Sequence, residues 1–280
     1  MGSYYCLMTG VPTLAMEGGN VSISYAEFRE LCEENLTASD KKLLYYAYLK
    51  QDCLNLVNLL KNSEAEIKLQ GNYSADELRQ LIEEAQLSDF PVEGYPAFLP
   101  EFIRNSYAAG KDKPGYFADD AVMLAYFQYA MACKNQMMSQ WFELNFNLTN
   151  ILTALIARKN GWNVADYVLG ENEISEMIKV NKSKDFDLGR EYDFVAELMK
   201  IVDTDDPVEK EKRIDAFKWI WLDEHTFFDS FNVEAVFAYL CKLEMQNRWE
   251  MLDPVKGKET FREIIENLRS EAKVPEEFTK

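Results

Sequence analysis

The sequence contains a single histidine, His225, among 280 residues. Zinc sites of the H-E-x-x-H type need two histidines, and di-iron helical bundles need a Glu-x-x-His pair on each of two helices. Glycine-rich phosphate loops and the G-x-S-x-G nucleophile turn are also absent. His225 follows Glu224 near an expected helix end, where a surface or capping role is the usual interpretation. We therefore expect a protein that is not an enzyme, with no catalytic residues, no metal and no cofactor.

Basic residues are scarce throughout the chain. The 30 Lys and Arg residues stand against 48 Asp and Glu residues, which gives a net charge of −18. The excess of acidic over basic residues is spread evenly along the chain, with a net charge of −8 over residues 1–140 and −10 over residues 141–280. Binding to nucleic acid depends on neutralising phosphates, and anionic lipid surfaces repel acidic proteins. We expect neither nucleic-acid binding nor direct lipid anchoring.

Long apolar runs and paired cysteines are missing as well. The best apolar run, Ala121–Cys133, is too short to span a bilayer and is interrupted by Gln128. The first ten residues, MGSYYCLMTG, lack the basic stretch of a secretory signal. The five cysteines are odd in number and show no C-x-x-C spacing, which favours a reducing compartment. We expect a cytoplasmic protein, with Cys133 and Cys241 buried in helices.

Acidic and aromatic clusters have ordinary structural interpretations. The run from Asp203 to Asp206 begins like a calcium loop but lacks the glycine and glutamate that complete one, so helix capping explains it better. Glu33-Glu34 and Glu83-Glu84 could act as acid and base, but a solvated face is the default on so acidic a chain. Tyr45-Tyr46-x-Tyr48 is interpreted as packing rather than as a platform for stacking bases.

Alternating strand patterns are absent, and helical patterns fill most of the chain. Residues 3–24 contain Gly10, Pro12 and the pair Gly18-Gly19, so this segment is expected to be an extended chain with turns. Ser24-x-x-Glu27 and Ser74-x-x-Glu77 are capping boxes. The predicted helices are Tyr25–Asn35, Thr37 or Ser39 to about Lys61, Ser74 to about Leu87, about Glu101–Ala109, one or two long helices over Phe117–Arg158, short helices near Val164–Val168, Ile174–Val180 and Glu191–Val202, one opened by Asp206-Pro207, Asn232 to about Leu252, and Thr260–Ala272. The fold class is therefore predicted to be all-α.

One segment, Trp141–Gly161, carries a polar stripe beside an apolar seam. The seam consists of Leu144, Leu148, Ile151 and Leu155, and the stripe consists of Glu143, Asn147, Asn150 and Arg158. Gly161 is expected to close this helix. Similar spacings recur at Asp52-x-x-Asn55 and at Glu244-x-x-Asn247, which Arg248 follows. With 18 asparagines in the chain, such pairs also arise by composition alone, so the spacing by itself assigns no function.

These three segments resemble the C-type subunit family of V/A-type ATPases, whose eukaryotic members are designated d. One pattern of the family consists of an acidic residue, then x-x-Asn-Ile/Leu, then an arginine and a glycine. The segment FELNFNLTNILTALIARKNGW is similar to this pattern, and the segment FNVEAVFAYLCKLEMQNRWEML is similar to the C-terminal pattern of the family. YLKQDCLNLVNLLK provides the N-terminal equivalent through Asp52 and Asn55. Gly170-Glu171 replaces a frequent Gly-Gly, and the chain is short, which is typical of a divergent, shortened bacterial branch.

The resemblance implies a non-catalytic rotor subunit of the central stalk. Such a protein is a funnel-like helical body of up to three related lobes, here about residues 1–110, 111–205 and 206–280. It receives the end of the central shaft and sits on the cytoplasmic face of the membrane rotor ring, and both would be its partners. The motif residues above would then serve architecture or interaction. Two alternatives remain open, a stand-alone helical scaffold or adaptor and a helical enzyme that uses carboxylates.

Overall fold

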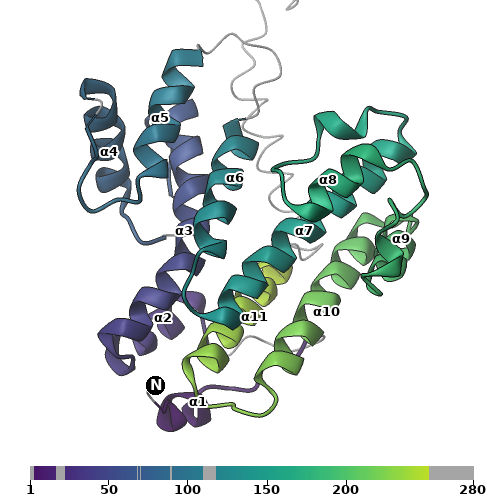
Figure 1. The fold of residues 1–280 in the computed structure, drawn as a ribbon. Helices are drawn as coiled ribbons and strands as arrows, with labels where there is room; N and C mark the ends of the chain where they lie inside the picture. Colours follow the sequence, from purple (N-terminus) through teal and green to yellow (C-terminus); the bar gives the residue numbers. More distant parts are fainter. Residues whose placement is uncertain are drawn as a thin grey trace, which may run out of the picture. The chain divides into compact units, whose positions relative to one another are not determined.

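The computed structural model describes residues 3–16, 23–67, 69, 71–88, 90–109 and 118–251. Over these ranges the chain forms eleven α-helices and two short 3-10 helices without any strand (Figure 1), which confirms the predicted all-α class. Within the described residues the chain divides into two compact units, one between Leu36 and His225 and one that combines the residues from Ser3 to Asn35 with those from Thr226 to Met251. The three expected lobes follow different bounds and stay a prediction. The expected helix Thr260–Ala272 lies outside the described residues.

The larger unit contains two helices of 24 residues each, α3 and α7. Each pairs with a shorter helix that follows it, α4 and α8 respectively. The helices of this unit are α3 (Ala38–Lys61), α4 (Ala75–Leu87), α5 (Phe98–Ala109), α6 (Ala118–Met131), α7 (Gln136–Lys159), η1 (Val164–Asp166), α8 (Glu173–Val180), η2 (Leu188–Arg190), α9 (Val195–Val202) and α10 (Pro207–Thr226).

The helix starts follow from side chains that cap the first backbone N–H groups. Thr37 Oγ1 accepts a hydrogen bond from Asp40 N at 3.3 Å, and Ser74 with Glu77 forms the predicted capping box. Asp206 Oδ1 accepts from Val208 N at 2.9 Å, directly before Pro207 at the first helical position. These contacts satisfy donors that a helix leaves without intrahelical partners. Local sequence therefore determines where these helices begin.

The long pattern over Phe117–Arg158 forms two helices in the described residues, the second of the two predicted arrangements. Asn135 ends the interruption because its Oδ1 accepts from Met138 N at 3.1 Å and caps α7. At the other end of α7, Gly161 adopts a φ of +72°. Trp162 N donates to Ala157 O at 2.9 Å there, which is the Schellman pattern. The prediction that Gly161 closes this helix is confirmed.

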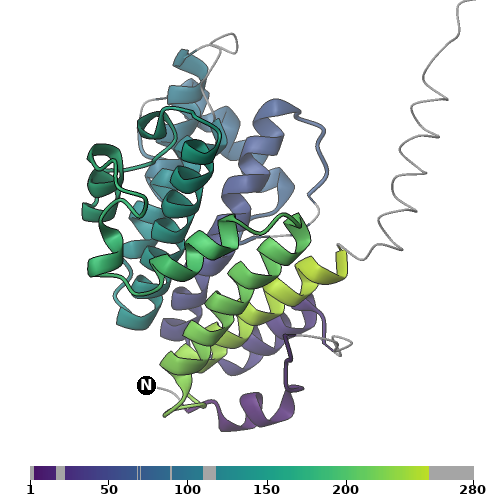
Figure 2. The ribbon, with the colours of Figure 1, turned by 90° about the vertical axis from the view of Figure 1, so that its right-hand side faces the viewer.

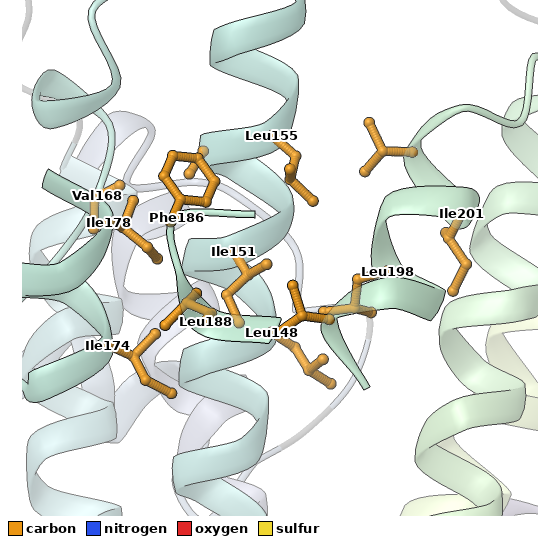
Figure 3. Packing of buried hydrophobic residues seen from close by; sticks show 13 residues of the cluster. Leu148, Ile151, Leu155, Val168, Ile174, Ile178, Phe186, Leu188, Leu198 and Ile201 are labelled. Carbon is orange, nitrogen blue, oxygen red and sulfur yellow. The ribbon is translucent and has the colours of Figure 1, made fainter. Parts of the chain in front are cut away.

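The apolar seam of α7 is the centre of one hydrophobic core. Leu148, Ile151 and Leu155 are all buried, and Leu144 packs against the same core from a partly buried position. Figure 3 shows the buried side chains of this cluster between α7, α8 and α9. The buried members are Leu148, Ile151, Ala154, Leu155, Val168, Ile174, Ile178, Phe186, Leu188, Val195, Leu198, Ile201 and Val202. The four-three-four spacing thus identified the face of α7 that is buried against its neighbours.

The spacing in the helix opened by Asp206-Pro207 predicts a buried face, and helix α10 buries that face only in part. The predicted face consists of Ile214, Phe217, Ile220 and Trp221. Ile214 and Phe217 pack, partly buried, against the hydrophobic cluster described above, whereas Ile220 is 56% exposed. The buried positions are instead Asp215, Trp219 and Leu222, which lie four and three residues apart. Both faces of α10 carry large apolar side chains, so periodicity alone does not choose between them. Packing against other helices makes that choice.

The smaller unit consists of α1 (Tyr5–Gly10), α2 (Tyr25–Asn35) and α11 (Val233–Met251). Helices α2 and α11 pack together (Figure 2), with the rings of Phe28 and Tyr239 4.5 Å apart. The extended conformation expected for residues 3–24 is wrong over α1. This helix has no side-chain cap, so the local sequence contains no capping signal that would predict it. Tyr4 N donates to Phe231 O at 2.6 Å, which ties the start of α1 to a segment distant in sequence.

None of the helices in the described residues has the length and apolar content needed to cross a membrane. Cys133 and Cys241 are buried free thiols, as predicted.

Candidate functional site

The polar pair on α3 binds the loop that leads into α4. Asp52 is fully buried, and its Oδ2 accepts from the backbone N and the side-chain Nδ2 of Asn72, both at 2.8 Å. Its Oδ1 accepts from Tyr73 N at 3.1 Å. A buried carboxylate accepts only, so these three N–H donors suit its chemistry. Asp52 therefore acts as an acceptor that holds the loop in place just before the Ser74 cap.

The same loop is held a second time by Asn55, one helical turn further along α3. Asn55 Nδ2 donates to Leu69 O at 2.9 Å, and its Oδ1 accepts from Gln51 Nε2 at 3.2 Å. Gly71 lies so close to Asp52 that a Cβ there would meet Asp52 Oδ1 at 2.1 Å. Only glycine lets the backbone approach the carboxylate this closely. Asp52 and Asn55, together with the loop residues that they bind, are named the first anchor.

An equivalent arrangement on α7 binds the loop that leads into α8. Asn150 Nδ2 donates to Leu169 O at 2.9 Å and to Ser175 Oγ at 3.1 Å, while its Oδ1 accepts from Leu169 N at 2.9 Å. Asn147 Oδ1 accepts from Asn172 Nδ2 at 2.7 Å. Asn172 also caps α8, since its Oδ1 accepts from Ser175 N at 2.9 Å. These residues form the second anchor, which uses carboxamides where the first uses a carboxylate.

The two anchors share a sequence signature that the pair spacing alone does not reveal. Leu69 and Leu169 provide the backbone groups, and an asparagine follows each leucine by three residues, Asn72 and Asn172. Both asparagine side chains donate to the earlier residue of the pair, Asp52 or Asn147. Sequence reasoning missed both loop asparagines. An internal comparison of the two Leu-x-x-Asn segments, each in front of a capped helix, could have found them.

Arg158 binds a different loop, the one that follows α8. Its Nη2 donates to Asn181 O at 3.1 Å, and its Nη1 donates to Ser183 O and to Lys184 O. The guanidinium carbon lies 3.7 Å from the centroid of the Phe186 ring, a cation–π arrangement. Burial lowers the pKa of Arg158 from its usual value, although nearby Asp185 acts in the opposite direction. Arg158 thus satisfies backbone carbonyls after the end of α8.

Glu143 does not join the buried part of the stripe. Its side chain is exposed, whereas Asn147 and Asn150 are 7% and 2% exposed. The structure therefore brings Asn147 and Asn150 together in one anchor and places Arg158 at a second loop. Glu143 lies on the solvent side of the same helix.

The third predicted motif lies on α11, in the smaller unit. Glu244 and Asn247 are half-buried, and the exposed Arg248 lies over the Trp249 ring at 5.9 Å. The contacts of α11 with the N-terminal segment come from two neighbours that sequence reasoning missed. Gln246 Nε2 donates to Ala15 O, and Tyr239 Oη donates to Pro12 O at 2.9 Å. Gln246 therefore binds a loop carbonyl much as Asn55 and Asn150 do, and this loop also precedes a capped helix, α2.

A tyrosine pair lies beside the first anchor and has no counterpart at the second. Tyr45 Oη and Tyr73 Oη are 2.7 Å apart, and Tyr73 Oη donates to Gly94 O at 3.0 Å. Burial raises the pKa of Tyr73 to about 12 and also raises the pKa of Tyr45. Tyr48 is buried as well. This supports the interpretation of the tyrosine run as packing.

The chemistry of the anchors is recognition of the chain's own backbone. Their carboxylate and amide groups form hydrogen bonds with groups of the loops. A depression of about 260 Å³ lies beside α3, lined by Gln51, Leu54, Asn55, Val57, Asn58, Glu66 and Asp119. Its carboxylate Asp119 pairs with Lys61 at 2.8 Å in an exposed setting. Across the described residues, no three His, Cys, Asp or Glu side chains are grouped as a metal site would require.

His225 lies at the exposed end of α10, as expected for a surface residue. Its ring stacks on Trp221 with centroids 3.7 Å apart, and its Nδ1 lies 2.8 Å from Trp221 O. This contact closes the last turn of the helix.

A model of the family described as "Protein of unknown function (DUF2764)" matches residues 1–272. The chain belongs to this family. Comparisons with curated proteins and with solved structures found no match. The match includes residues of both compact units, so both units are part of the sequence that defines the family.

Proposed function

We propose that this chain is a non-catalytic central-stalk component of a V/A-type ATPase, related to the C-type subunit family, that couples the shaft to the membrane rotor ring. The proposal starts from the resemblance of three segments, centred on Asp52, Asn150 and Glu244. It puts the protein in a complex on the cytoplasmic face of the membrane, where neighbouring proteins and not lipid would hold it.

The single observation that carries the proposal is the recurrence of one structural device at the resembling segments. In the first two, a buried polar pair on a 24-residue helix binds the loop in front of the next helix. In the third, the helix α11 binds the N-terminal loop through Gln246. The three segments that resemble one family pattern thus each contain a long helix that holds a loop.

This device suits a protein that transmits torque. Loops are usually the softest parts of a fold, because few contacts oppose their motion. Buried hydrogen bonds from a helix to a loop backbone stiffen that loop, and their loss leaves buried polar groups unsatisfied. A protein that is turned by one partner and turns another needs such stiffness, since a flexible body would absorb the rotation.

The test is co-assembly with the ATPase subunits encoded in the same genome. The affinity-tagged chain, co-expressed with the shaft and ring subunits, is expected to purify with both and to be required for ATP-driven ion pumping by the assembled enzyme. The purified chain alone is expected to bind no ATP in isothermal titration calorimetry. Failure to bind either shaft or ring, or measurable nucleotide affinity, would contradict the proposal.

The second candidate is the stand-alone adaptor. Exposed aromatic side chains favour it, because they suit binding to a partner protein without specifying which partner. Phe228 is 97% exposed and Phe227 is 76% exposed. An adaptor would use such residues on some other partner, without any effect on ion pumping. The pumping assay above therefore separates the two candidates.

A further inference from the structure

The turn between α10 and α11 presents two phenyl rings to solvent. Phe227 and Phe228 are 76% and 97% exposed, and their rings meet edge to face with centroids 5.2 Å apart. Scattered exposed apolar residues are normal, but two adjacent rings at the tip of one turn form a concentrated apolar feature. Buried aromatic anchors of this kind contribute much of the binding energy at protein interfaces.

The turn that carries these rings is fixed by its neighbours. Its third aromatic residue, Phe231, is half-buried, and the centroid of its ring lies 4.8 Å from that of Tyr5 in α1. Phe231 O accepts from Tyr4 N at 2.6 Å, and Phe231 N donates to Asp229 Oδ1 at 3.2 Å. Asn232 then caps α11. Because the turn is already ordered, binding through Phe227 and Phe228 would lose little conformational entropy.

The charge around the turn restricts the kind of partner. Between Lys218 and Lys242 the sequence has no Lys or Arg, and it contains Asp223, Glu224, Asp229 and Glu234. The described part of the smaller unit holds eight acidic and three basic residues, a net charge of −5. Anionic lipid would repel this surface, although phenyl rings alone could enter a bilayer. A complementary partner has an apolar pocket with Lys or Arg around it.

Cytoplasmic loops of membrane proteins carry an excess of Lys and Arg, which matches this requirement. We infer that Phe227 and Phe228 are the residues through which this chain docks on the cytoplasmic loops of the rotor ring, with the acidic residues near the turn facing the basic loops. This inference rests on the proposed function, and it adds the surface that faces the ring rather than the shaft.

The test compares two double variants in binding to the detergent-solubilised rotor ring and, separately, to the purified shaft subunits. Phe227→Ser with Phe228→Ser is expected to weaken ring binding at least tenfold in surface plasmon resonance and to leave shaft binding unchanged. Leu87→Ser with Phe90→Ser is the matched control, because these side chains are also exposed, at 86% and 79%, but lie at the end of α4 and just after it in the larger unit. The control is expected to bind the ring like the wild type. Raising the salt concentration is expected to weaken wild-type ring binding, since charge attraction is screened.

The possible results separate the inference from the proposed function. Ring binding that the Phe227 and Phe228 changes leave intact, or that the control changes weaken equally, would overturn the inference alone. A wild-type chain that binds neither ring nor shaft would overturn the proposed function and the inference with it. A third measurement uses vesicles of four parts phosphatidylcholine and one part phosphatidylglycerol. If the wild type binds these vesicles and the phenylalanine variant does not, docking on protein is overturned in favour of docking on lipid. Circular dichroism of both variants verifies that they fold.

Discussion

In the helix pair α3–α4 the connecting loop binds a carboxylate, whereas in α7–α8 the corresponding loop binds two carboxamides. Asp52 only accepts, so its partners are the N–H groups of Asn72 and Tyr73. Asn150 donates and accepts, so it holds both the N–H and the C=O of Leu169. The positions in the fold match, but the hydrogen-bond polarity of the loop differs. The loop conformation therefore determines which polar residue the helix needs.

The two polar pairs also differ in the residues that surround them. The first anchor has Gly71 against the carboxylate and the tyrosine pair beside it. The second has the Ser175 hydroxyl, which donates to Leu169 O at 2.9 Å, and the hydrophobic cluster of α7–α9 on the same helix. The first anchor thus depends more on one carboxyl side chain, while the second shares its hydrogen bonds among several carboxamide and hydroxyl groups. The three predictions below follow from this difference.

The largest effect is expected for Asp52→Ala. The change removes the acceptor of three buried N–H groups, so we expect a loss of about 3–5 kcal/mol of stability. Denaturant unfolding of the full chain measures the loss. Hydrogen exchange by mass spectrometry is expected to show faster exchange at residues 71–88 and no change at residues 169–180. Equal acceleration in both segments would mean that the two anchors are not independent.

Asn150→Leu is expected to cost somewhat less, about 2–4 kcal/mol, because Ser175 still holds Leu169 O. The faster exchange should appear at residues 169–180 and not at residues 71–88. Thr149→Leu is the matched control, since its side chain is exposed on the same helix. If both variants unfold at the same denaturant concentration, the hydrogen bonds of Asn150 do not stabilise the loop.

The smallest effect is the response of the first anchor to alkaline pH. The pKa of Tyr73 is raised to about 12 by burial, against about 10 in an unfolded chain. The neutral hydroxyl is therefore favoured in the folded state. Its contribution, roughly 1–2 kcal/mol, is fully present below pH 10 and is lost as the pH rises through 12.

Urea unfolding at pH 8.5 and pH 11 measures this contribution. Tyr73→Phe removes the ionising group, so the variant is expected to lose less stability between the two pH values than the wild type does. Tyr107→Phe is the control, because Tyr107 is 45% exposed. An equal alkaline loss in the wild type and Tyr73→Phe would show that Tyr73 does not titrate with the fold.

Much of the local structure could be predicted from the sequence, because it depends on neighbours along the chain. The capping boxes at Ser24 and Ser74 and the Asp206-Pro207 start all function as predicted. The glycine at the end of α7 does so too. Each of these features involves residues within a few positions of one another, so the pattern of residue types is sufficient.

The candidate site was predictable only in part. The spacing identified Asp52, Asn55, Asn147 and Asn150 as polar residues within apolar helices. It grouped Glu143 with them, although that side chain is exposed. It did not find Gln246 or Tyr239, whose partners in the N-terminal segment lie 231 and 227 residues away in sequence. A contact at that separation leaves no trace in helical periodicity.

The sequence by itself determined most of the helices, the starts that are capped by side chains and the residues able to anchor a loop, since these follow from capping, periodicity and side-chain chemistry. Only the tertiary structure decided which face of α10 is buried, that residues 5–10 form a helix, and which loop each polar side chain binds. The physical reason is that burial and long-range hydrogen bonds depend on which surfaces meet. A polar residue such as Asn150 carries the capacity to bind, and the fold supplies the partner.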